Sequence, residues 1–252
     1  MHTYDALSGV TVTPEMDRCA GSMVLIHSMP YIRKLLSEVL ERKALSPCGG
    51  RRSAHTAQSE KELGERPGVY FYAGRVFPHG VGTVVFMLPA SLQPDRLADA
   101  RACPFDSGGV LQGRSSLPWQ QFEDTAGEYV NSHKVDIGQF RDYLGRHLSS
   151  FFESPENYWE APDRGIDGLD HGRADIRKHW RDWTFEIAAF AEVPLSKMKM
   201  YVSLDANNFL AEKERNAVQS EWIDIDTADN PSEKAEREAR KIALTTEGGK
   251  DR

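Results

Sequence analysis

The chain has 252 residues, of which 40% are hydrophobic and 27% are charged, and 31 Lys and Arg against 38 Asp and Glu give a formal net charge of −7. This composition indicates a globular protein that can bury a sizeable core, in one large domain or two small ones. The negative charge argues against broad, nonspecific nucleic-acid binding, and no apolar run approaches the ~20 residues of a membrane span.

The N-terminal half alternates between short apolar runs and helical patterns. Residues 1–22 are expected to be irregular, and 23–27 form a predicted strand that ends at His27. Apolar residues then recur at helical spacing over 32–40, and the polar residues 49–66 predict a loop. Residues 68–73 and 82–88 predict two further strands, rich in aromatic and branched side chains, and 95–102 predict one or two helical turns.

The C-terminal half begins with a predicted helical insertion over about residues 115–175. Strands are expected around Glu186 and over 198–204, and a helix over 209–222. Residues 228–252 are rich in charge and poor in aromatics, which predicts a polar tail that is disordered or partly helical. The order of elements favours a single α+β domain over 23–227 rather than an alternating βαβ fold.

Targeting and cysteine patterns favour the cytoplasm. The first 19 residues lack a basic start followed by an apolar core, so we expect no secretory signal. The three cysteines, Cys19, Cys48 and Cys103, are scattered and odd in number, which fits reduced thiols better than a disulfide framework. None belongs to a CxxC pair, so we expect no structural zinc site.

The segment Trp183–Phe190 has the composition of a buried strand, yet it carries a carboxylate in its middle. In a regular strand Thr184, Glu186 and Ala188 share one face, opposite Phe185. A charge is rarely placed inside an apolar run unless it is paired, solvated in a cleft or used. The structural alternative is a Glu on an edge strand that faces water.

Three other sites could converge on this carboxylate. His27 closes the first strand, Tyr70 and Tyr72 share a face of the second, and Asp106 and Ser107 stand beside two glycines. Each has a structural alternative: a half-buried histidine, aromatic cross-strand packing, and a simple glycine turn.

Several familiar motifs are missing from the sequence. No G-x-G-x-x-G follows a strand, and there is no P-loop or HExxH and no G-x-S-x-G elbow. His171, near Asp167 and Asp170, is a weak candidate ligand, and we expect no metal site. A hydrolase that uses Asp106 or Ser107 is an open alternative, because an acid beside a hydroxyl is a nonspecific pattern.

The chain order of these residues resembles the ADP-ribosyltransferase family. The elements that carry the resemblance are the strand ending in His27 with the helix 32–40 and Leu45-Ser46-Pro47, then Gly68-Val69-Tyr70-Phe71, then Trp183-Thr184-Phe185-Glu186 with Val193-Pro194-Leu195 and the strand 198–202. The resemblance covers about residues 23–205 and, without a Ser-Thr-Ser motif, points to the His-Tyr-Glu branch. The long interval before Glu186 and the loop 105–109 depart from the family pattern.

The resemblance implies a transferase of the glycosyltransferase class on an α+β, split-sheet core with a helical insertion. It would move ADP-ribose from NAD to a macromolecular acceptor, and a toxin or defence role would fit a small cytoplasmic enzyme. By resemblance, Glu186 stabilises an oxocarbenium-like state and orients a ribose hydroxyl, His27 binds the nicotinamide ribose, and Tyr70, or else Tyr72, stacks on the nicotinamide. Asp106 is a separate candidate for a polar contact.

The main alternative function is a noncatalytic binding or interaction protein on an α+β scaffold. In that case Glu186 is a surface or paired residue and the tyrosines belong to the core. The first hypothesis requires His27, Tyr70 and Glu186 to line one cleft.

Overall fold

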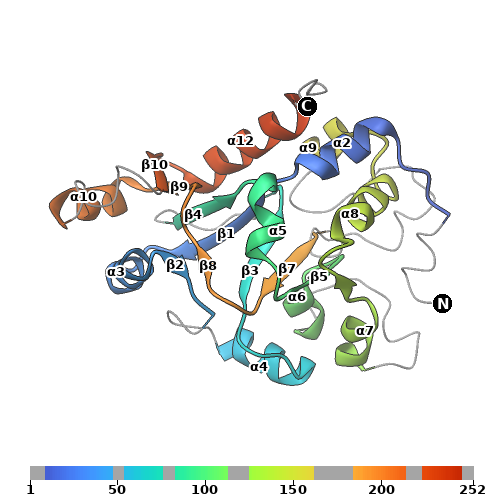
Figure 1. Ribbon diagram of the computed structural model, residues 1–252, viewed down its shortest axis with the longest axis horizontal. Helices are drawn as coiled ribbons and strands as arrows, with labels where there is room; N and C mark the ends of the chain where they lie inside the picture. The colour runs from blue at the N-terminus through green and yellow to red at the C-terminus, as the bar shows by residue number, and fades with distance from the viewer. Residues whose placement is uncertain are drawn as a thin grey trace.

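The computed structural model describes residues 9–47, 54–75, 83–112, 125–161, 184–213 and 223–245. Its centre is a mixed eight-stranded sheet with helices around it (Figure 1). The strands of this sheet are β1 (Leu25–Pro30), β3 (Val69–Ala73), β4 (Thr83–Leu88), β5 (Ala100–Cys103), β6 (Val135–Asp136), β7 (Glu186–Ala189), β9 (Met198–Val202) and β10 (Ile223–Thr227). Their spatial order is β10-β9-β4-β1-β3-β7-β5-β6, and β2 (Ala44–Leu45) pairs separately with β8 (Val193–Pro194).

The sheet is nearly divided into two halves between β1 and β3. Strand β1 pairs with β4 along its whole length, from Leu25 to Pro30. It pairs with β3 only through Leu25↔Ala73 and Ile26↔Tyr72. The predicted α+β class with a split sheet is therefore confirmed, and the site described below lies in the half formed by β3, β7, β5 and β6.

The helices are α2 (Pro14–Ser22), α3 (Arg33–Arg42), α4 (Ala54–Leu63), α5 (Gln93–Arg96) after the short 3₁₀ turn η1 (Ala90–Leu92), α6 (Ser107–Leu111), α7 (Ala126–Ser132), α8 (Phe140–Ser149), α9 (Pro155–Glu160), α10 (Leu204–Lys213) and α12 (Pro231–Thr245). Helix α12 lies along β4 and β9 and meets α2, which packs on α8 (Figure 1). Helices α4, α6 and α7 contact one another in the part of the molecule nearest β5 and β7. No helix among these described residues is both long and apolar enough to cross a lipid bilayer.

The N-terminal segment that was predicted to be irregular contains helix α2. The Thr13 side chain accepts a hydrogen bond from the backbone N–H of Met16, and Pro14 occupies the first helical position, which are two standard signals for a helix start. Met16, Cys19 and Ala20 are buried against the core. The prediction failed because only these three residues of the helix form its buried face.

Two elements near the end of the sheet formed by β5 and β6 also differ from the sequence prediction. Helix α4 occupies residues that were predicted as a loop. The prediction was wrong because the helix buries only a narrow strip, Ser59, Glu60 and Leu63, and is otherwise polar. The predicted helical turns over 95–102 are instead the end of α5 followed by β5. Strand β5 is held by pairing with β7, about 85 residues later, and local sequence carries no sign of such a partner.

Residues 231–245, part of the predicted polar tail, form helix α12. Its buried residues include Ala235, Ala239 and Ala243, which recur every four positions and lie on one face. Alanine adds little to local hydrophobicity, so charge dominates this sequence although the helix packs on the sheet. Helix α10 likewise begins at Leu204, five residues before the predicted start.

A buried arginine ties α12 to the core. Arg75 donates from Nε to Glu236 at 3.0 Å and from Nη1 to the carbonyl oxygens of Tyr158 (3.2 Å) and Ala161 (2.7 Å). Its side chain is 5% exposed. This arginine therefore joins α9, α12 and the end of β3, away from the pocket described next.

Candidate functional site

Glu186 is the first residue of β7, an interior strand between β3 and β5. Its cross-strand neighbours are Tyr72 on β3 and Cys103 on β5, and the residue is 2% exposed. On the opposite side of the chain Phe185 packs on His147 of α8. The alternative of an edge-strand Glu facing water is therefore wrong, and the carboxylate is truly inside the protein.

A buried arginine compensates the charge of Glu186. Arg101 on β5 donates from Nη1 to Glu186 Oε1 at 2.7 Å. The same guanidinium donates to Glu65 from Nε (2.8 Å) and Nη2 (3.1 Å). The Lys134 ammonium lies 2.8 Å from Glu65 Oε1. Two cations thus alternate with two carboxylates in a line from partly exposed Lys134 to buried Glu186, which satisfies the rule that buried charges are paired.

Ser107 completes the hydrogen bonding of this carboxylate. Its Oγ donates to Glu186 Oε1 at 2.5 Å and accepts from Arg101 Nη2 at 3.1 Å. Both hydrogen bonds to Glu186 end on Oε1. Within the part of the chain that the structure describes, Oε2 is therefore the oxygen left for a ligand.

The local fold explains why Ser107 lies there. It is the first residue of α6, whose cap is Asp106: the Asp106 Oδ1 accepts from the Gly109 backbone N–H at 3.0 Å. This capping contact fixes the turn that follows β5. Asp106 and Ser107 are both buried, 4% and 2% exposed, so the loop predicted to approach a ligand is held rigidly beside Glu186.

Burial and neighbouring charges shift the pKa values of the site in opposite directions. Burial raises the pKa of Glu186 above its usual value, Arg101 acts against this rise, and the nearby Asp106 adds to it. Burial alone would lower the pKa of Arg101, but Glu186 and Glu65 raise it, so the guanidinium stays charged. Burial also raises the pKa of the Cys103 thiol to about 12, which keeps this neighbour neutral.

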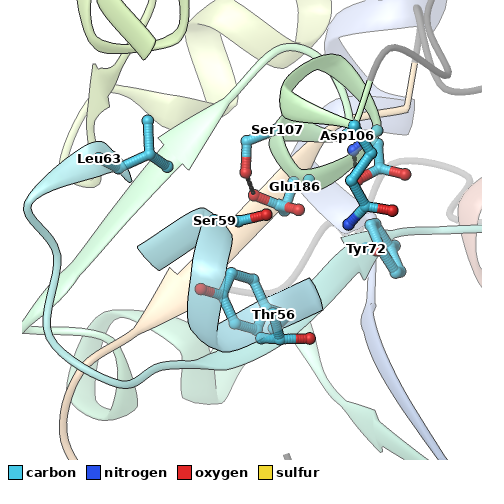
Figure 2. Close-up of a pocket in the computed structure, with 11 residues that line it drawn as sticks. Thr56, Ser59, Leu63, Tyr72, Asp106, Ser107 and Glu186 are labelled. Atoms are coloured by element: carbon cyan, nitrogen blue, oxygen red, sulfur yellow. Dashed lines mark hydrogen bonds between the residues drawn. The ribbon is translucent and has the colours of Figure 1, made fainter. Parts of the chain in front are cut away.

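A pocket of about 220 Å³ opens onto this carboxylate (Figure 2). Its lining combines two carboxylates, two tyrosines, three hydroxyl residues and two glycines, with one amide and one leucine: Thr56, Ser59, Leu63, Tyr70, Tyr72, Asp106, Ser107, Gly108, Gly109, Gln112 and Glu186. These come from α4, β3, α6 and β7. In Figure 2 the Ser107–Glu186 hydrogen bond lies at one side of the cavity, and Thr56 and Ser59 face it from α4.

The two predicted tyrosines both reach the pocket, and one of them is anchored. The Tyr70 hydroxyl donates to Glu60 Oε1 at 3.1 Å, and the same oxygen accepts from the Gly68 backbone N–H at 3.0 Å. Glu60 is 3% exposed. Helix α4 therefore holds the ring of Tyr70 from behind while Tyr72, the cross-strand neighbour of Glu186, stands beside it.

His27 lies outside the pocket lining. Its cross-strand partner is Phe86 and its ring also meets that of Phe71, which places it on the face of the sheet opposite Tyr72, because successive strand residues alternate in direction. His27 Nδ1 donates to the Tyr70 carbonyl oxygen at 2.8 Å. The structure thus brings Tyr70, Tyr72, Asp106 and Glu186 together at one pocket, and the expectation that His27 lines the same cleft is not met. His27 contacts this group through the backbone of β3.

Sequence reasoning missed Arg101, Glu65 and the residues of α4. Arg101 carries a usable signal, since Ala100-Arg101-Ala102-Cys103 is a charge inside an apolar run, the same pattern that drew attention to Glu186. Glu65 and α4 carry none, because their sequence is polar on nearly all sides. Trp183 and the weak metal candidates His171, Asp167 and Asp170 lie outside the described residues. Among the residues that the structure does describe, no group of three or more His, Cys, Asp or Glu could hold a metal ion.

Comparison with known proteins gives likeness in structure only. No protein-family model and no curated protein matches the chain. Among solved structures, DarT of Thermus sp. 2.9 in complex with ADP-ribosylated ssDNA is 9% identical, with a TM-score of 0.46, over 86% of this chain and 97% of that one. The same protein in complex with NAD+ is also 9% identical, with a TM-score of 0.45, over 86% of this chain and 98% of that one.

Proposed function

We propose that the pocket binds the nicotinamide end of NAD and that the protein transfers ADP-ribose to a macromolecular acceptor. The observation that carries the proposal is a buried carboxylate whose Oε1 is tied to Arg101 and Ser107 while its side chain lines a tyrosine-walled pocket. A carboxylate fixed in this way can face a positive charge that develops in a transition state.

The size and charge of the pocket favour one end of the dinucleotide. Its volume of about 220 Å³ is below the roughly 300–1,000 Å³ of pockets that enclose a drug-sized ligand. Asp106 and Glu186 contribute two carboxyl groups, and none of the described lining residues is Lys or Arg. Such a lining favours the positively charged nicotinamide ring and its ribose, and leaves the diphosphate and adenosine outside.

The proposed chemistry is cleavage of the bond between the ribose C1′ and the nicotinamide nitrogen. The electron pair of that bond leaves with nicotinamide, which becomes neutral, and the ribose acquires oxocarbenium character. Glu186 stabilises this charge and binds a ribose hydroxyl through Oε2. Tyr70, held by Glu60, or Tyr72 stacks on the departing ring, Asp106 makes a polar contact, and the acceptor then attacks C1′.

The role predicted for His27 stays a prediction. Its hydrogen bond to the Tyr70 carbonyl supports an indirect part in placing Tyr70. The hydrolase alternative called for a cleft around Asp106 and Ser107 away from Glu186, whereas these residues line the same pocket as Glu186, so we do not propose it. The noncatalytic alternative allows a paired Glu186, as in its contact with Arg101, and labelled NAD distinguishes it from ADP-ribose transfer.

The proposal is tested with NAD labelled separately in nicotinamide and in adenylate. Release of nicotinamide reports cleavage, and adenylate label on protein, single-stranded DNA or RNA, offered in separate reactions, reports the acceptor. Glu186→Gln should reduce cleavage by about a hundredfold or more, because the amide keeps the shape but loses the charge.

The matched control is Glu236→Gln, the same change at the partner of the other buried arginine. It should leave cleavage at the wild-type rate, with both variants giving the wild-type circular dichroism spectrum. Equal rates for wild type and Glu186→Gln, or no cleavage by wild type with any acceptor, would contradict the proposed function.

A further inference from the structure

We propose that Ser107 is a positioning residue: together with Arg101 it locks Glu186 through Oε1, so that an ionised Oε2 is presented to the pocket. This inference rests on the proposed function, since it concerns the residue given the central role there. Ser107 acts through Glu186 and is assigned no bond to the substrate.

The hydrogen-bond directions at Ser107 determine its role. A hydroxyl has one hydrogen to donate, and Arg101, which has only donors, gives one of its own to Ser107 Oγ at 3.1 Å. The Ser107 hydrogen is therefore turned toward Glu186 Oε1, at 2.5 Å. A serine held between a guanidinium and a carboxylate can donate only in this direction, so it stabilises the ionised form of Glu186.

The surroundings of Glu186 make this donor important. Asp106 is the residue before Ser107 and its negative charge, with burial, disfavours a second carboxylate beside it. The other neighbours that could titrate are Cys103, which stays a neutral thiol, and Tyr72 across the strand pair. Arg101 lowers the pKa of Glu186 where Asp106 raises it, but Arg101 also donates two hydrogen bonds to Glu65.

The contacts also fix the orientation of the carboxylate. Arg101 reaches Oε1 from β5, and Ser107 reaches the same oxygen from α6. Two donors from different elements on one oxygen restrict rotation of the carboxylate about its last bond. Loss of Ser107 should therefore affect the transition state, in which Glu186 acts, more than the binding of NAD, so kcat should fall while KM changes little.

The test compares Ser107→Ala with Ser59→Ala. Both remove a buried serine hydroxyl that lines the pocket, but only Ser107 donates to Glu186. The pH dependence of kcat/KM reports the carboxylate in the free enzyme. Two or three hydrogen bonds lower a carboxylate pKa by about two units, so the acid limb of Ser107→Ala should move up by about one pH unit, while that of Ser59→Ala stays with wild type.

A second readout does not depend on turnover. Protein labelled with ¹³C at the glutamate side-chain carboxyls is titrated by NMR, and the Glu186 signal is assigned as the one missing from Glu186→Gln. Its midpoint should rise by the same amount in Ser107→Ala and not in Ser59→Ala. Equal midpoints in Ser107→Ala and wild type overturn the inference, whether or not NAD is cleaved. A shifted midpoint in a protein that never cleaves NAD sinks the proposed function and leaves the Ser107 contact to Glu186 supported.

Discussion

Two of the arginines that the structure describes are buried, and their surroundings differ. Arg75 is 5% exposed and Arg101 is 7% exposed, and each donates from Nε to a glutamate, Glu236 at 3.0 Å and Glu65 at 2.8 Å. Nη1 of Arg75 binds two backbone carbonyls in and after α9, whereas Nη1 of Arg101 binds a second, buried carboxylate.

The difference shows which kind of buried charge indicates function. Arg75 satisfies carbonyl groups at the end of α9, which helices leave without intrahelical partners, so its contacts explain its presence. Arg101 compensates Glu186, and within the described part of the chain no backbone N–H donates to the Glu186 carboxylate, so no such structural task explains it. A buried charge that needs another buried charge to compensate it, beside a pocket, is the stronger sign of a site.

The largest expected effect is a difference in the free energy of unfolding lost when each of the two arginines is replaced. Arg101→Met should lower the free energy of unfolding by about 3–5 kcal/mol, because it leaves Glu186 buried without its cation and Glu65 with Lys134 alone. Arg75→Met should lower it by about 1.5–3 kcal/mol, since Glu236 retains access to water with a side chain 24% exposed. Urea unfolding at neutral pH measures both. Equal losses of stability in the two variants would contradict the inference that Arg101 compensates more buried negative charge than Arg75 does.

The second prediction concerns Glu65, one of the two glutamates that pair with Arg101. Glu65 is 7% exposed on its side chain. Burial raises its pKa, but the hydrogen bonds and charges of Arg101 and Lys134 outweigh burial and lower the pKa below 4.5. A lowered folded-state pKa stabilises the protein above the unfolded value, and this contribution is lost as pH falls through the folded value.

Wild type should therefore lose stability as pH falls below about 4.5, and Glu65→Gln should lack that part of the loss. At neutral pH Glu65→Gln should be less stable than wild type by about 1.5–3 kcal/mol. Thermal unfolding between pH 3 and 7 checks both, and an unchanged acid dependence in Glu65→Gln would show that Arg101 and Lys134 do not hold this carboxylate ionised.

The sequence predicted one member of this charge network and missed the others for local reasons. Glu186 follows Thr184 and Phe185 and precedes Ile187, so its charge contrasts with an apolar neighbourhood. Arg101 also contrasts with Ala100, Ala102 and Cys103, but its strand has four residues and ends directly before Pro104, which is too short for a periodic pattern to show. Its pairing with β7 spans about 85 residues and no local signal encodes it.

The walls of the pocket show the same limit. Tyr70 and Tyr72 were predicted to share a face because alternation in a strand is local. Helix α4 was predicted as a loop, although it supplies Thr56 and Ser59 to the pocket and Glu60 to Tyr70. Two of its three buried residues, Ser59 and Glu60, are polar, so the apolar periodicity by which a helix is recognised is absent.

The smallest expected effect concerns the outer end of the network. Lys134 is 26% exposed and lies 2.8 Å from Glu65. Water screens a partly exposed pair, so Lys134→Met should cost only about 0.5–1 kcal/mol. Because salt at about 1 M shortens the screening length to about 3 Å, the difference between Lys134→Met and wild type should shrink as salt is added, whereas the difference between Arg101→Met and wild type should persist. Urea unfolding at low and high salt measures both differences. If the stability difference between Lys134→Met and wild type did not change with salt, the Lys134 ammonium would be as shielded from solvent as Arg101. The distinction between the inner and outer ends of the network would then be wrong.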